Sequence, residues 1–250
     1  MREMKRLFII LVLFTLLIVT PSVSIQTDYS PDLIPRQGGN TIIEWTVVDA
    51  PDAAFALFWS GADSWIAEAG SQMEFNVTDA SGEIEGQLTL GNVTFSANNT
   101  NIAKDLILGV WGLTPWFPGL VVKIGESSME ALNQTAFASA ERVYGNYLNG
   151  SMVSSYEAVL SNGISYDCII FEYEQDPTGF GDPQLTTLAY DTETGVLVKA
   201  NTSFSFGTPY SLILELEGIY IPTVDPSFLW MGVAIVGVVI VIVALLRFRR

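Results

Sequence analysis

SMVSSYEAVLSNGISYDCIIFEYEQD, residues 151–176, is the stretch that decides the fold of this chain. Its two halves are rich in β-branched and aromatic side chains, which favour strands. Between them lies Asn162-Gly163, a dipeptide that readily adopts the positive φ angles of a tight hairpin turn. The stretch therefore predicts two long antiparallel strands joined by a short turn.

Strand patterns continue on the C-terminal side of this hairpin. Residues 183–191 and 195–206 are joined by Thr-Glu-Thr with Gly195 after it, which predicts a second hairpin, of the bulged kind. Residues 209–222, PYSLILELEGIYIP, add a further strand. Four or five consecutive antiparallel strands then form a meander.

Strand patterns also precede the hairpin. Residues 40–50 and 54–61 are rich in β-branched and aromatic side chains, and residues 72–97 alternate polar with apolar side chains around glycine turns. They predict more antiparallel strands. Together with the meander they define one domain, over residues 40–222.

Two helices interrupt these strands. The first is predicted over residues 100–111, and the second begins at Ser127, whose spacing to Glu130 fits a capping box, and stops at Gly145. The predicted class is α+β, with a curved, meander-rich antiparallel sheet and two helices packed on one side. The apolar faces of the helices consist of Ile102, Leu106 and Val110 in the first, and of Met129, Leu132, Ala136, Ala140 and Val143 in the second.

The C-terminal end carries a long apolar run. Residues 228–246 contain no charge, and nineteen residues in a helix reach roughly the 30 Å of a bilayer core. A buried core helix is the alternative, but such helices usually carry a polar stripe. The sequence predicts a linker at 223–227, a transmembrane helix at 228–246 and a basic cytoplasmic tail at 247–250. A sorting signal that is removed after translocation is a further alternative.

The N-terminal end has the three parts of a secretory signal. Arg2, Lys5 and Arg6 precede a short apolar stretch at 7–19, and small residues follow. Residues 1–24 are therefore predicted to be a cleaved signal peptide, with an uncleaved anchor as the second choice. Residues 25–39, polar and rich in Pro and Gly, are predicted to be an extended leader. Both ends place the domain between them outside the cell membrane.

Charge and composition exclude several functions. Residues 25–227 hold five basic and 26 acidic side chains, a net charge of −21 that repels nucleic acid. The chain has no histidine and one cysteine, Cys168, which excludes Ser-His triads and clusters of zinc ligands. Asp176 and Asp182 flank a glycine-rich loop that fits a turn better than a calcium site. No enzyme activity, cofactor or metal is predicted, and Cys168 is expected to be a buried small hydrophobe.

One connection carries an unusual number of large aromatic side chains. In GVWGLTPWFPGLVVKIG, residues 109–125, Trp111, Trp116 and Phe117 lie among Gly and Pro between the two helices. Such side chains usually plug the end of a core. The alternative is that Trp111, Trp116 and Phe117 line the mouth of an apolar groove and bind a ligand.

Six N-x-S/T sequons are present. Asn76 and Asn201 are predicted to point away from the core on their strands, whereas the sequon at Asn133 falls near the buried stripe of the second helix. Glycosylation is therefore expected at Asn76, Asn92, Asn98, Asn149 and Asn201, and not at Asn133.

The layout of signal, acidic β-rich domain, C-terminal span and RFRR resembles archaeal cell-surface proteins of the choice-of-anchor type, with residues 166–210 closest to them. The meander around AYDTETGVLVKA is also similar to bacterial lipoprotein-carrier domains, whose half-barrel binds acyl chains. Neither resemblance implies catalytic residues. The expected function is that of a single-pass cell-surface glycoprotein with a binding or structural ectodomain, whose partners are the membrane and a surface protein. The alternative is an extracytoplasmic carrier or sensor of an apolar or lipid-like ligand.

Overall fold

The computed structural model describes residues 28–35, 39–52, 54–106, 108–109, 116–143, 150–175, 184–204 and 210–221. Several predictions lie outside these residues. They concern the signal peptide, the C-terminal apolar run with its basic tail, the glycine-rich loop between Asp176 and Asp182, and the single residues Trp111 and Asn149. Within the described residues, no helix has the length and apolar character needed to cross a membrane.

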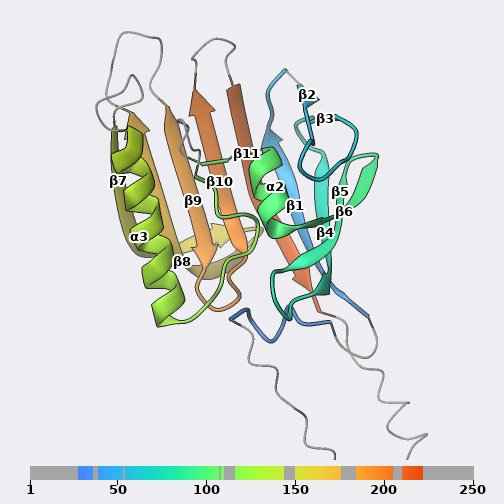
Figure 1. Cartoon of the computed structure of the whole chain (residues 1–250), viewed down its shortest axis with the longest axis horizontal. Helices are drawn as coiled ribbons and strands as arrows, with labels where there is room; N and C mark the ends of the chain where they lie inside the picture. Colours follow the sequence, from blue (N-terminus) through green and yellow to red (C-terminus); the bar gives the residue numbers. More distant parts are fainter. Residues whose placement is uncertain are drawn as a thin grey trace, which may run out of the picture.

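The domain is built on one nine-stranded sheet in which every pair of neighbours is antiparallel (Figure 1). The order is β6-β5-β4-β1-β11-β10-β9-β8-β7. The predicted α+β class is confirmed, as are the meander that follows the first hairpin and the antiparallel strands that precede it. The strands are β1 (Thr41–Asp49), β4 (Gln72–Asp79), β5 (Glu85–Leu90), β6 (Val93–Asn98), β7 (Gly150–Ser161), β8 (Ile164–Gln175), β9 (Leu185–Asp191), β10 (Leu197–Phe204) and β11 (Tyr210–Tyr220).

β1 joins the two halves of the sheet, because it pairs with β4 on one side and with β11 on the other. Its side chains alternate between faces, and Ile43, Trp45 and Val47 are fully buried. The Trp45 indole Nε1 donates to the carbonyl oxygen of Leu197 at 2.7 Å, which satisfies the one polar atom of this large side chain.

Two helices, α2 (Asn99–Leu106) and α3 (Glu126–Val143), lie on the same face of the sheet (Figure 1). α3 contacts β7 and β8, and α2 contacts β6. The predicted apolar faces are confirmed for the buried side chains of Ile102, Leu106, Met129, Ala136 and Ala140.

The boundaries of both helices differ from the prediction. α2 ends at Leu106, earlier than expected. α3 begins at Glu126, because the carbonyl of Gly125 accepts hydrogen bonds from the N–H groups of Ser128 and Met129. Ser127 therefore lies inside the first turn and is not the N-cap, so the predicted capping box is wrong.

The strand predicted at residues 54–61 is also wrong. Only β2 (Ala54–Phe55) forms there, paired with β3 (Trp65–Ile66) in a separate two-stranded sheet. The residues between them form a turn. The predicted leader, in its described part, contributes buried side chains of Tyr29 and Leu33 to the core.

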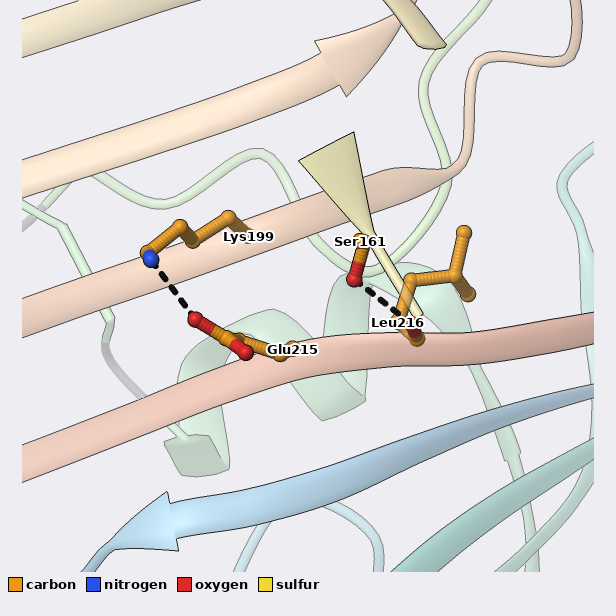
Figure 2. Close-up of polar contacts among 4 residues, drawn as sticks. All are labelled: Ser161, Lys199, Glu215 and Leu216. Carbon is orange, nitrogen blue, oxygen red and sulfur yellow. Dashed lines mark hydrogen bonds and ion pairs between the residues drawn. The ribbon is translucent and has the colours of Figure 1, made fainter. Parts of the chain in front are cut away.

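The paired strands β7 and β8 are longer than the neighbouring strands β9 and β10. The tip of their hairpin bends across the face of the sheet opposite the helices (Figure 1). Asn162 (φ 45°) and Gly163 (φ 77°) form the predicted turn. At the tip, Ser161 Oγ donates to the Leu216 carbonyl at 2.7 Å, close to the 2.6 Å ion pair of Lys199 with Glu215 (Figure 2). The tip thus passes β9 and β10 and is held on β11.

Candidate functional site

The aromatic connection between the helices packs into the interior. Trp116 and Phe117 are 6% and 8% exposed, and the Trp116 ring lies edge-on to Phe171 of β8, with centroids 5.3 Å apart. Gly109, the first residue of this connection, leaves room for the Trp116 carbonyl, which a Cβ there would overlap. The two described aromatic side chains are therefore part of the core.

Asn99, at the start of α2, holds the next part of this connection. Its Oδ1 accepts from the N–H groups of Leu120 (2.8 Å) and Val121 (3.2 Å), and its Nδ2 donates to the carbonyls of Pro118 (3.1 Å) and Val121 (2.8 Å). A buried amide with this many backbone partners fixes the path of the chain. The sequence contained one signal for this role of Asn99, namely the Asn98-Asn99 pair before a helix. The sequence analysis considered only Asn98 of this pair, as a glycosylation site.

Gly119 lies at the centre of the same connection. Its φ of 105° suits glycine, and a Cβ there would overlap the Asn99 side chain. On its other side, the Tyr190 hydroxyl donates to the Gly119 carbonyl at 2.9 Å. Complete burial raises the pKa of Tyr190 well above its usual value, so this donor keeps its proton.

A groove opens to solvent between the starts of α2 and α3. It encloses about 620 Å³. An ion pair lies at its rim, where Lys123 Nζ is 2.6 Å from Asp28 Oδ2, and this hydrogen bond raises the pKa of Lys123. Hydroxyl groups from α3 complete the wall, contributed by Ser127, Ser128 and Thr135.

A second surface is formed by residues 54–70, which we call the finger. It exposes three large apolar side chains: Phe58 is 84% exposed, Ile66 67% and Trp59 60%. A second open groove, of about 620 Å³, runs beside it and ends at Asn92 in the turn between β5 and β6. The failed strand prediction at residues 54–61 thus contains Phe58, the most exposed large apolar side chain among the described residues.

The sequons occupy different environments. Asn76 and Asn201 are half-buried on strands, and the prediction that Asn76 faces away from Met73, Phe75 and Val77 is confirmed. Asn92 is exposed in its turn, whereas Asn98 ends β6 and accepts a hydrogen bond from the Asn101 N–H at 2.8 Å. Asn133 is half-buried on α3, and its Oδ1, like that of Asn76, is shielded from solvent.

Cys168 is a buried side chain on β8, as expected. Burial raises the pKa of its thiol to about 12, with further contributions from the negative charges of Asp191 and Asp167. A thiol that keeps its proton is a poor nucleophile. Among the described residues, no three acidic or cysteine side chains gather in a way that would hold a metal ion.

Comparisons of the chain with protein-family models, with curated proteins and with solved structures find no match.

Proposed function

We propose that the chain is a single-pass cell-surface glycoprotein, and that its acidic ectodomain acts as a binding or structural module through its outer surface and not by catalysis. The observation that carries this proposal is the packing of Trp116 and Phe117 against the sheet. A carrier of an apolar ligand needs an interior that a ligand can enter, and the burial of these two side chains in the core favours the surface function over the carrier.

The sequence outside the described residues supports the anchoring half of the proposal. The last strand ends at Tyr220, and the uncharged run at 228–246 follows after a short linker, with three arginines behind it. The strong negative charge between the two apolar ends fits a domain exposed to an extracellular medium.

The anchor is tested by removing residues 228–250 in the producing cell. The full chain is expected to sediment with membranes and to resist extraction by high salt, while the shortened chain is released into the medium. A variant in which 228–246 is replaced by nineteen leucine and alanine residues should stay in the membrane, because apolar length and not sequence provides the anchor. A shortened chain that still sediments in high salt would contradict the proposal.

Topology needs a separate measurement. In intact cells, protease added outside should digest the domain and leave the tail at 247–250 protected. The opposite pattern, a protected domain, would contradict the surface location even if the anchor itself holds.

A further inference from the structure

The finger exposes large apolar side chains to solvent in a fixed arrangement. Phe58, Trp59 and Ile66 are each more than half exposed, although their neighbours Phe55, Leu57 and Trp65 are buried. Exposed apolar clusters on a soluble surface mark interaction sites more often than not. Trp in particular is enriched among the residues that dominate binding energy at interfaces.

Asp105 at the end of α2 fixes this turn. It is buried, and its carboxylate accepts hydrogen bonds from the backbone N–H groups of Trp59 and Ser60, both at 2.9 Å, and from the Ser60 hydroxyl at 2.5 Å. At the base of the finger, the rings of Phe55 and Trp65 stack with centroids 5.1 Å apart. The exposed side chains are thus pre-organised, which lowers the entropy that binding would cost.

The charges around the finger are almost all negative. Asp52, Asp63 and Glu68 are exposed, and the last two line the groove beside Ile66. Lys104 is the only basic residue in the sequence from 39 to 109, and its Nζ lies 4.6 Å above the Trp59 ring. Because a cation of the chain itself already lies over the Trp59 ring, the exposed carboxylates of Asp63 and Glu68 are the groups left for the cations of a partner.

The finger also lies at one end of the sheet. Asp49, the last residue of β1 before it, pairs with Ile213, whereas the other end of β1 pairs Ile42 with Tyr220. These pairs are separated along the strand by roughly 24 Å at 3.4 Å per residue. Figure 1 shows β2 and β3 at the upper end of the sheet. A domain anchored after Tyr220 would hold the finger away from its own membrane.

We propose that the finger is a docking surface for a protein segment in which arginine or lysine alternates with apolar side chains. The apolar side chains pack on Phe58, Trp59 and Ile66, and the cationic ones reach Asp63 and Glu68 in the adjoining groove. This inference deepens the proposed surface function by naming the chemistry of the partner. A membrane surface fits less well, since the acidic side chains repel the anionic lipids that most biological membranes carry.

The test measures binding of a synthetic peptide to the full chain in nanodiscs of zwitterionic lipid, with empty nanodiscs as the blank. The probe is Ac-Arg-Leu-Arg-Leu-Arg-Leu-NH₂, compared with the same peptide carrying citrulline in place of arginine. The arginine peptide is expected to bind at least about tenfold more tightly than the citrulline peptide, and its affinity should fall with salt.

Variants of the chain locate the binding. Trp59→Ala and Asp63→Asn should each weaken it about tenfold or more, while two matched changes on other surfaces, Leu160→Ala and Glu141→Gln, should leave it unchanged. All four side chains are exposed, so the variants are expected to keep the melting temperature of the original chain.

Three results would overturn the inference. The first is that the arginine peptide does not bind, and the second is that Glu141→Gln weakens peptide binding as much as Asp63→Asn does. The third is that the peptide does not bind while the chain clusters added zwitterionic vesicles in a way that depends on Trp59. The last would assign the finger to a membrane. None of them bears on the anchor, which the fractionation of the shortened chain tests alone.

Discussion

Among single residues, the buried thiol of Cys168 has an effect on stability that pH can reveal. Because burial raises the pKa of Cys168 to about 12 in the folded chain from an ordinary 9.0, the unfolded state loses its proton first as pH rises. The contribution of this thiol to stability is complete below pH 9 and is lost progressively between pH 9 and 12. Chemical denaturation across this range should show stability falling by up to about 1.4 kcal/mol per pH unit from this group, and less in Cys168→Ala.

The same burial predicts slow alkylation. Iodoacetamide at pH 8 should leave Cys168 unmodified in the folded chain and modify it rapidly in denaturant, as followed by intact mass. Rapid modification of the folded chain would mean that this part of β8 opens often.

Trp116 separates the two functions considered for the domain. Since it is packed against Phe171, Trp116→Ala should lower the free energy of unfolding by about 3–5 kcal/mol, measured by urea denaturation. Trp59→Ala is the matched control, because the same side chain is exposed there and its loss should cost little. If Trp116→Ala keeps its stability and instead abolishes binding of an apolar dye, the interior is a ligand site and the carrier function is restored.

At the level of elements, the hydrogen bond from Ser161 to Leu216 holds the tip of the β7–β8 hairpin on β11. Ser161→Ala removes the donor to the Leu216 carbonyl and should cost about 1 kcal/mol, with faster hydrogen exchange at the hairpin tip. Ser165→Ala, on the exposed part of the same hairpin, is the control and should change neither quantity. Unchanged exchange in Ser161→Ala would mean that other contacts hold the tip.

Local chemistry explains which elements were predictable. Asn162-Gly163 and Gly195 encode their turns through positive φ, and the alternation of β1 encodes its buried face. The strand prediction at residues 54–61 is wrong because an apolar run has the same composition in two situations. It can be buried in a sheet, or a distant group can hold it in solvent. That group is Asp105, about 45 residues away along the chain, and no local pattern connects it to Trp59. The hydrogen bonds of Asn99 are hidden for the same reason.

For the whole molecule, the exposure of each sequon asparagine determines whether it can carry a glycan. Mass-spectrometric site mapping of chain produced in a glycosylating host should find Asn92 occupied, because it is exposed in a turn, and Asn133 unoccupied, because its side chain is half-buried on α3 with Oδ1 shielded from solvent. Asn92→Gln should remove one glycan and leave the melting temperature unchanged. A glycan on Asn133 would mean that α3 detaches from β7 and β8 while the chain is being modified.

The position of β1 has a consequence for how the chain is made. Ile42 pairs with Asn76 on one side, which is synthesised soon afterwards, and with Tyr220 on the other, which is among the last described residues to be synthesised. Throughout elongation β1 therefore keeps one backbone edge without its partner, and the two meanders cannot be joined until β11 leaves the ribosome. Contacts so distant in sequence make folding slow, and an unpaired edge invites association with other nascent chains. The domain should thus depend on chaperones during its synthesis and acquire protease resistance in one late step, when β11 arrives.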